Sequence, residues 1–179
     1  MRSKPTRTAV RAGEAGGTFV FNTPLGRCHL AWGPQGIRRV SLGGPATRRS
    51  ASREAVPAAI RQAADRLTSH LAGCPVAMRD VAVDLTAATA FTRKVYQTLR
   101  LVPPGEVVTY GELARRAGRP SASRAVGRAM ATNPVPLLVP CHRVIQSGGG
   151  LGGFGMGGPS VKARLLRIEG VRIEGGRAR

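Results

Sequence analysis

Alternation of apolar and polar residues near the start of the chain predicts a small antiparallel sheet. The runs TFVFNT, RCHLAW and IRRVSL are separated by the turn-forming sequences PLG and GPQG. Short β-prone runs divided by Gly/Pro turns are typical of an antiparallel meander of three strands. Residues 1–16 precede these runs and are expected to form a flexible lead-in.

The apolar spacing then changes to that of a helix. Apolar residues recur three or four positions apart, namely Val56, Ile60, Ala63, Leu67 and Leu71. Gly73 follows them and predicts the helix end. We therefore expect residues 17–85 to form an N-terminal sheet-plus-helix domain, with the sequence DVAVDLTAAT as the bridge to the second half.

Helical spacing dominates the second half of the chain. The apolar residues from Phe91 to Val102 predict a helix that stops at the sequence PPG. Thr109 and Glu112 then have the spacing of a capping box, in which the hydroxyl caps the first turn and the carboxylate reaches back. This second helix is expected to end at Gly118.

A further short helix follows a tight turn, with Ser121 as its expected N-cap and Asn133 just beyond its end. Two short helices joined in this way, in a basic chain, predict a helix-turn-helix. One stripe of this further helix is apolar and suits the core: Ala122, Ala125, Val126, Ala129 and Met130. The opposite stripe combines small residues with two arginines: Ser123, Arg124, Gly127, Arg128 and Ala131. Such a stripe favours close contact with DNA, although an alanine-rich helix from a biased genome is the alternative interpretation.

Composition adds a strong positive charge to this pattern. The 179 residues include 28 Lys or Arg against 9 Asp or Glu, for a formal net charge of +19. Such a charge favours a polyanionic partner, most often nucleic acid. Nearly all of the cations are arginine, so compositional bias is an alternative, and part of the charge lies in ends such as GGRAR that are expected to be disordered.

The sequence also argues against several other classes of protein. It has no apolar run of membrane-spanning length, and the start lacks the apolar middle of a secretory signal, so we expect a cytoplasmic protein. Cys28, Cys74 and Cys141 form an odd set without CxxC spacing, which argues against a disulfide framework or a four-cysteine zinc site.

Two Cys-His pairs are candidates for chemistry. Cys28-His29 lies in an alternating strand, so its side chains point to opposite faces and Cys28 is expected to pack as a small hydrophobe. Cys141-His142 lies in the proline-bounded apolar run VPLLVPCHRVI, which suggests rigid, buried backbone in an extended segment. A thiol becomes a strong nucleophile beside a cationic or hydrogen-bonded histidine, here through a turn or a bridging water.

Glu169 is the candidate carboxylate partner for this histidine. It lies in the last turn of a predicted helix that starts near Pro159-Ser160 and stops at Gly170. A carboxylate at that end opposes the helix dipole and therefore needs a partner or solvent. A solvated Glu169 beside neighbouring arginines is an equal alternative on this evidence.

Three stretches resemble the methylated-DNA–protein-cysteine methyltransferases, also called O6-alkylguanine-DNA alkyltransferases. They are FTRKVYQTLRLVPPGEVVTYGELARRAG, SRAVGRAMATNPVPLLVPCHRVI and GGPSVKARLLRIEG. The likeness is continuous from about Phe91 to Gly170, and NTPLGRCHLAWGPQGIRRVSL is similar to the family's N-terminal domain. The resemblance implies single-use repair, in which an alkyl group passes from guanine O6, and thymine O4, to a cysteine of the protein.

The resemblance assigns chemical roles to five residues. Cys141 would accept the alkyl group, His142 would deprotonate it through a water, and Glu169 would orient His142. Tyr110 would donate its hydroxyl to the leaving guanine, and Asn133 would brace the turn around the site.

The resemblance also implies which residues contact DNA. Carbonyls of Cys141 and Val144 would accept from the base's amino group, and Arg124 would be inserted into the stack where the target base leaves. The base must be flipped out, because a thiolate cannot reach an alkyl carbon inside a duplex. The implied DNA and substrate contacts are Ser123, Arg124, Gly127, Arg128, Ala131, Val144 and Phe154.

The implied fold is of the α+β/α class. It combines a ribonuclease-H-like N-terminal sheet with a helix and a helical C-terminal domain, residues 86–172, that carries a winged-helix-like helix-turn-helix. Residues 173–179 would be a tail. The implied partner is double-stranded DNA, bound through its minor groove by a monomer that needs no cofactor and no metal.

The loop QSGGGLGGFGMGGPSVK departs from the family pattern. The family has an aromatic residue, one small residue and then Gly-Gly, whereas Phe154 is separated from Gly157 by two residues. The glycines suggest a mobile, roomier wall for the alkyl pocket, and the donor to guanine O6 is left unassigned. Two other functions stay open: a helix-turn-helix protein that binds DNA or lesions without transfer, and a Cys-His hydrolase.

Overall fold

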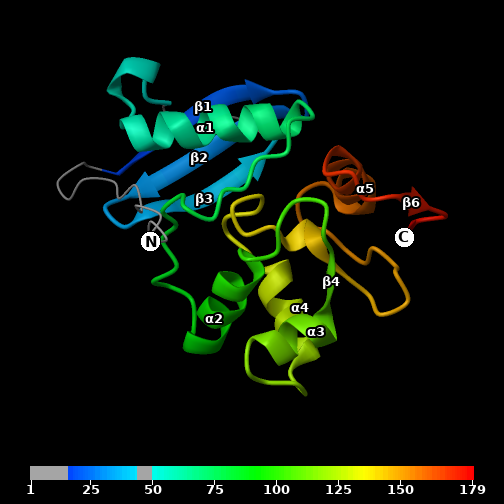
Figure 1. The fold of residues 1–179 in the computed structure, drawn as a ribbon. Coiled ribbons are helices and arrows are strands. Elements are labelled where there is room, and N and C mark those ends of the chain that lie inside the picture. Colours follow the sequence, from blue (N-terminus) through cyan, green and yellow to red (C-terminus); the bar gives the residue numbers. More distant parts are fainter. Residues whose placement is uncertain (1–15, 44–49) are drawn as a thin grey trace, which may run out of the picture.

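The computed structural model describes residues 16–43 and 50–179. A three-stranded sheet with one long helix forms one side of the molecule, and a group of shorter helices forms the other (Figure 1). The predicted lead-in, apart from Gly16, and part of the connector after the sheet lie outside the described residues.

The predicted meander is confirmed. Strands β1 (Gly17–Thr23), β2 (Gly26–Gly33) and β3 (Gly36–Leu42) are antiparallel and paired in sequence order. The register pairs Phe19 with Leu30 and Leu30 with Val40, so apolar side chains share one buried face. A bulge follows Ala31 and accompanies a shift in the pairing with β3.

Helix α1 (Ala58–Leu71) lies along the sheet, after a single 3₁₀ turn, η1 (Arg53–Ala55) (Figure 1). Its predicted apolar stripe is buried, and Gly73 adopts the left-handed conformation, with φ of +100°, just after the helix end. One polar residue, His70, lies on this buried stripe. The helix therefore supplies both the core and one polar group to the interior.

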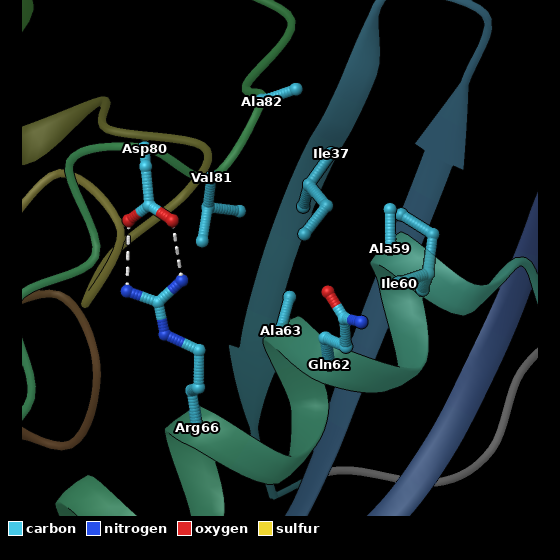
Figure 2. A pocket seen from close by; sticks show the side chains of 9 residues that line it. All are labelled: Ile37, Ala59, Ile60, Gln62, Ala63, Arg66, Asp80, Val81 and Ala82. Carbon is cyan, nitrogen blue, oxygen red and sulfur yellow. Dashed lines mark hydrogen bonds and ion pairs between the residues drawn. The ribbon is translucent and has the colours of Figure 1, made fainter. Parts of the chain in front are cut away.

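The segment after α1 is fixed to both the helix and the sheet, as Figure 2 shows around a small pocket. Arg66 of α1 forms a bidentate pair with Asp80, each N–O distance being 2.8 Å. The N–H of Ile37 donates to the carbonyl of Ala82 at 3.0 Å, and the backbone N–H of Asp84 donates to the carbonyl of Ile37 at 2.8 Å. The predicted bridge is thus hydrogen-bonded along the edge of β3.

The second half contains helices α2 (Ala90–Leu99), α3 (Tyr110–Arg116) and α4 (Ser123–Ala131), and α3 contacts α4. Only half of the predicted capping box forms: Thr109 Oγ1 accepts from the N–H of Glu112 at 3.1 Å, whereas the Glu112 carboxylate pairs with Arg116 one turn later. The predicted N-cap of α4 is wrong by one residue. Ala122 occupies that position and makes no side-chain cap bond, because Ser121 lies one residue too early.

The segment from Asn133 to Ile145 differs from the extended chain that its prolines suggest. Cys141–Arg143 form a 3₁₀ turn, η2, between Pro140 and strand β5 (Val144–Ile145). Strand β5 pairs in parallel with β4 (Val108–Thr109), immediately before α3. The extended conformation predicted for this segment is therefore wrong at Cys141-His142, which lie on a turn.

Helix α5 (Gly158–Ile168) follows the glycine-rich loop and has Glu169 as its C-cap, as the sequence predicted within two residues. The expected tail is instead a hairpin of strands β6 (Ile173–Glu174) and β7 (Arg177–Ala178). The N–H of Ala178 donates to the carbonyl of Gly149 at 2.9 Å, so the hairpin is held against the loop before α5. Local sequence does not reveal this pairing, since it depends on tertiary contact.

Most of the buried hydrophobic side chains form one continuous cluster that includes residues of the sheet, α1 and all of the shorter helices before α5. A smaller cluster joins α5 to the hairpin through residues such as Leu166 and Val171. Within residues 16–43 and 50–179, no helix has the length and apolar character that a membrane crossing requires.

Candidate functional site

Cys141 begins η2 directly after Pro140 and is buried. Its Sγ accepts a hydrogen bond from Asn133 Nδ2 at 3.2 Å. Burial raises the pKa of Cys141 above its ordinary value, although the Asn133 bond and the charge of Lys162 act in the opposite direction. The resting residue is therefore a protonated thiol that needs a base before it can act as a nucleophile.

Asn133 also fixes the backbone before the thiol. Its Nδ2 donates to the carbonyl of Val139 at 2.8 Å, and its Oδ1 accepts from the N–H of Val135 at 3.1 Å. Between these residues Leu137 has φ of +71°, a conformation that non-glycine residues rarely adopt. The side chain of Asn133 thus supports a strained turn that positions Cys141.

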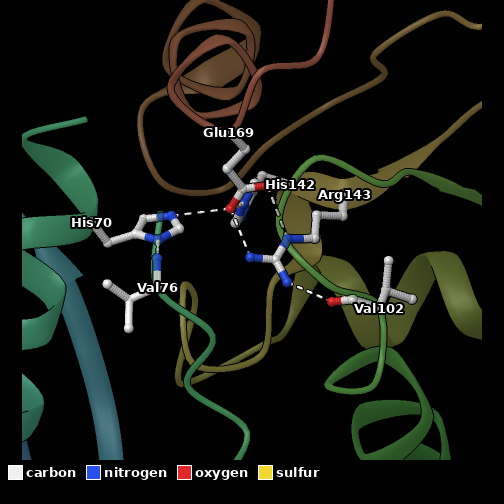
Figure 3. Close-up of polar contacts among 6 residues, drawn as sticks. All are labelled: His70, Val76, Val102, His142, Arg143 and Glu169. Atoms are coloured by element: carbon white, nitrogen blue, oxygen red, sulfur yellow. Dashed lines mark hydrogen bonds and ion pairs between the residues drawn. The ribbon is translucent and has the colours of Figure 1, made fainter. Parts of the chain in front are cut away.

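His142 is fully buried on the same 3₁₀ turn and faces the carboxylate of Glu169 (Figure 3). Its Nε2 lies 2.9 Å from Glu169 Oε1, so Nε2 carries the proton. Its Nδ1 is also buried and has no hydrogen-bond partner among the described residues. Burial lowers the pKa of His142 more than the bond to Glu169 raises it, so the ring is a neutral base with a free lone pair on Nδ1.

Two further residues bind Glu169. Arg143 Nε donates to Oε2 at 2.9 Å and Arg143 Nη2 to Oε1 at 2.7 Å, while His70 Nε2 lies 3.0 Å from Oε1 (Figure 3). Hydrogen bonds from the three partners hold the pKa of Glu169 far below its usual range despite burial. We refer to His70, His142, Arg143 and Glu169 as the Glu169 cluster.

This cluster includes ligand types that metals use. Within the described residues, His70, His142 and Glu169 form a group whose ligand atoms lie within 4.8 Å of one another. Both histidine Nε2 atoms, however, contact the same carboxylate oxygen, and Arg143 bonds both oxygens of that carboxylate. The residues fit a hydrogen-bonded carboxylate better than a cation site.

A cavity of about 420 Å³ opens beside the thiol. It is lined by Tyr110, Gly127, Met130, Ala131, Cys141, Gly153, Phe154 and Gly155. Burial raises the pKa of Tyr110, and the charge of Cys141 raises it further when that residue is a thiolate, so the phenol stays protonated and able to donate. A second cavity of about 210 Å³ also reaches Cys141 and extends toward β3 past Phe154 and Met156.

The carbonyl of Val144 already has a partner. Lys162 of α5 is completely buried, and its Nζ donates to Val144 at 2.6 Å and to Leu151 at 2.5 Å. Burial lowers the pKa of Lys162 to about 8. The carbonyl of Cys141 accepts from the N–H of Val144. A nucleobase that donated a hydrogen bond to either carbonyl would share that oxygen with the donor that the protein already supplies.

The predicted outward stripe of α4 lies beside the cavity. Arg124 and Arg128 are exposed, and Gly127 and Ala131 line the cavity wall. A Cβ atom added at Gly127 would meet no protein atom of the described residues within 4 Å. The glycine therefore leaves open space at the surface and is not required by packing within the protein.

The other two cysteines do not line either cavity that reaches Cys141. Cys28 is fully buried in the sheet, and burial raises its pKa to about 12. His29 is less buried and lies on the other face, as predicted. Cys74 is exposed and free.

Three polar residues near the site were missed by sequence reasoning. His70 interrupts the apolar stripe of α1, and Lys162 lies among the apolar positions of α5, so a polar residue on a core stripe was the available signal. Arg143 had no comparable signal, because its partner is 26 residues away. Only the fold brings these groups together.

Comparison with known proteins agrees with this geometry. Residues 90–171 match the family model described as 6-O-methylguanine DNA methyltransferase, DNA binding domain. A methylated-DNA–protein-cysteine methyltransferase of Methanothermobacter thermautotrophicus is 36% identical over 152 residues, covering 85% of this chain and 84% of the relative. The protein of that name from Homo sapiens is 38% identical over 166 residues, covering 86% and 80%.

A solved structure is also similar. The crystal structure of Mycobacterium tuberculosis OGT in complex with DNA has a TM-score of 0.72 and 34% sequence identity, covering 86% of this chain and 92% of that chain. The sequence likeness and the fold both extend over most of the chain. This protein belongs to the methylated-DNA–protein-cysteine methyltransferase family.

Proposed function

We propose that the protein repairs alkylated DNA by moving a methyl group from O6 of guanine to Sγ of Cys141. The observation that carries this proposal is a buried thiol, on the wall of a cavity, followed by a neutral histidine whose Nδ1 is unpartnered within the described chain. Family membership supports alkyl transfer as the reaction. O4-methylthymine is proposed as a second substrate.

The transfer is balanced without a cofactor. Nδ1 of His142 takes the thiol proton through a bridging water, and the thiolate attacks the methyl carbon. The S–C bond forms as the C–O6 bond breaks, and the bonding electron pair moves into the guanine ring. Guanine takes up one proton as its normal form is restored, so the net change is the exchange of a thiol proton for a methyl group. Cys141 stays methylated, which makes each molecule a single-use acceptor.

The surrounding residues support this step. Glu169 holds Nε2 of His142 and thereby leaves Nδ1 as the base. Tyr110 stays a phenol on the cavity wall and donates to the guanine as negative charge develops on it. Asn133 braces the turn and donates to Sγ, which favours the thiolate once it forms. Carbonyls of Cys141 and Val144 would accept from the exocyclic amine in addition to their existing donors.

DNA is proposed to bind along α4 through its minor groove. Arg124 and Arg128 are exposed, and small residues beside them permit close approach of the duplex. The contact set comprises Ser123, Arg124, Gly127, Arg128 and Ala131, with Phe154 at the cavity. Arg124 would fill the gap in the stack after the base is flipped into the cavity, at a cost of about a few kcal/mol.

The finer description of the fold is part of the same proposal. The sheet and α1 are of ribonuclease-H-like type, and α3 and α4 form a winged-helix-like helix-turn-helix. The proposed division places the first domain at residues 17–85 and the DNA-binding alkyltransferase domain at 86–172. We propose that the protein acts as a cytoplasmic monomer.

Stoichiometry tests this function. A duplex containing O6-methylguanine is added in excess, and the restored guanine should level off at one per protein molecule. Cys141→Ser should restore none while still binding the duplex. Repair beyond one base per molecule would contradict the single-use mechanism, and binding without any repair by the unsubstituted protein would favour a lesion-binding protein instead.

A further inference from the structure

His70 connects the first half of the chain to the Glu169 cluster. It lies near the end of α1, whereas the other three residues lie between positions 142 and 169. Its side chain is 2% exposed, and that of Glu169 is not exposed at all. It does not line the cavity beside Cys141, so any effect on the reaction must pass through Glu169.

Hydrogen bonding fixes the tautomer of His70. The backbone N–H of Val76 donates to Nδ1 at 3.1 Å, and a backbone N–H can only be a donor. Nδ1 therefore carries a lone pair, and the proton of the neutral ring lies on Nε2. Nε2 is 3.0 Å from Glu169 Oε1, so His70 donates to the carboxylate (Figure 3).

Oε1 of Glu169 thus accepts from three side chains. His142, Arg143 and His70 lie at 2.9, 2.7 and 3.0 Å from it. Arg143 belongs to the same turn as His142, whereas His70 comes from a different element and restrains the oxygen independently. Glu169 also terminates α5, where the helix dipole disfavours a carboxylate. The carboxylate therefore depends on the donors His142, Arg143 and His70 to hold it at this position.

We propose that His70 is a positioning residue for methyl transfer: it holds Oε1 of Glu169 where that oxygen binds Nε2 of His142 and leaves Nδ1 to act as the base. This inference rests on the proposed function of Cys141 and His142. It assigns to α1 a part in the reaction that the cavity alone does not show.

The same contact affects the charge felt by His142. The charged and titratable groups that act on this ring are Glu169 at the end of α5, Arg143 on its own turn and His70 from α1; Cys141 begins the same turn. Loss of the His70 donor leaves the carboxylate charge less compensated, so Glu169 holds a proton on His142 more tightly and the pKa of His142 rises. The pH below which transfer slows should rise with it.

Two substitutions separate this contact from packing. In His70→Asn the shorter side chain can still accept from Val76 but cannot reach Glu169. In His70→Gln the amide lies near the position of Nε2 and can donate to Glu169. Ile60→Val is the control, since it removes a buried methylene from α1 away from the cluster. Single-turnover rates with an O6-methylguanine duplex are measured against pH for all four full-length proteins.

For His70→Asn we expect a plateau rate lowered about 10-fold and a low-pH limb raised by roughly half a pH unit. His70→Gln should recover most of the rate, and Ile60→Val should keep the original profile. A His70→Asn profile that superimposes on that of the unsubstituted protein, or a rate loss without a pH shift that His70→Gln does not reverse, would overturn the inference.

A second measurement does not depend on the variants folding. The ¹⁵N chemical shifts of His70 in the unsubstituted protein should place the proton on Nε2 at neutral pH. A proton on Nδ1 would contradict the inference, whatever the variants show. If the unsubstituted protein transfers no methyl group at all, the proposed function is wrong and the inference is overturned with it.

Discussion

Glu169 places a buried negative charge at the carboxyl end of α5, where the helix dipole opposes it. Arg143, His142 and His70 compensate for that position. A buried carboxylate with this set of donors stabilises the fold only while it is ionised, because its partners otherwise lose their acceptor. Stability and base positioning therefore depend on the same side chain.

Glu169→Gln should make this dependence measurable. The amide leaves Arg143 buried without a counter-charge, so the free energy of unfolding at neutral pH should fall by about 3 kcal/mol or more. The pKa of Glu169 is lowered by folding, so its contribution to stability is fully present above the unfolded value of about 4.3 and is lost as the pH falls below it. Denaturant unfolding of the unsubstituted protein and of Glu169→Gln should show that the difference between their free energies of unfolding becomes smaller below about pH 4. A difference that stays constant with pH would contradict the assignment.

The residues proposed to carry the chemistry could be singled out from the sequence, whereas the residues that hold them could not. Cys141 and His142 are adjacent, and Glu169 was conspicuous because its position conflicts with the dipole. His70 reaches Glu169 across 99 positions of sequence, and its spacing on α1 is that of an ordinary core residue. Contacts between distant elements leave no local pattern, so only the structure reveals them.

At the level of elements, the starts of α3 and α4 are stabilised differently. Thr109 Oγ1 accepts from the N–H of Glu112 at 3.1 Å, which caps α3. Ser121 was predicted to cap α4, but Ala122 lies at that position and no side-chain cap bond forms. The sequence identified both helices correctly and misplaced one cap, because a turn can shift a boundary by one residue without changing the apolar pattern.

Thr109→Ala and Ser121→Ala test this difference as a pair. The first removes a side-chain cap and should lower the free energy of unfolding by about 1 kcal/mol. The second removes an exposed hydroxyl without a cap bond and should change it by less than roughly 0.5 kcal/mol. Thermal or urea unfolding of the two variants provides the measurement. Equal losses would mean that Ser121 does cap α4 in solution.

At the scale of the whole molecule, the charge of +19 raises the question of which cations bind DNA. The proposal assigns phosphate and stack contacts to the exposed arginines of α4, although arginines occur elsewhere on the surface. Arg167 of α5 is exposed, and α5 lies apart from α3 and α4 in Figure 1. Replacing Arg167 by alanine therefore serves as a control, because it lowers the net charge by the same amount as replacing an arginine of α4.

Duplex affinity is therefore measured against salt for Arg128→Ala and Arg167→Ala. A lost phosphate contact should reduce the slope of log affinity against log salt by about 1 in Arg128→Ala. Arg167→Ala should leave the slope close to that of the unsubstituted protein. Equal effects of the two substitutions would show that net charge, not α4, governs binding.

The arrangement of the whole chain was predictable where each element has its own periodicity. The meander, α1 and the helices of the second half follow from alternation or helical spacing. The hairpin of residues 173–178 was not predictable, because its short strands are fixed by a bond from Ala178 to Gly149. The 3₁₀ turn at Cys141 and the bond between Cys141 and Asn133 were not predictable either, because no periodic pattern of apolar residues accompanies them.

The most direct test of the central claim is the location of the transferred methyl group. The protein is incubated with an O6-methylguanine duplex and digested, and the masses of its peptides are measured by mass spectrometry. We predict that one methyl group is added to the peptide containing Cys141, on its sulfur, and that peptides containing Cys28 or Cys74 are unchanged. A methyl group on another residue, or on none while the duplex is bound, would contradict the account.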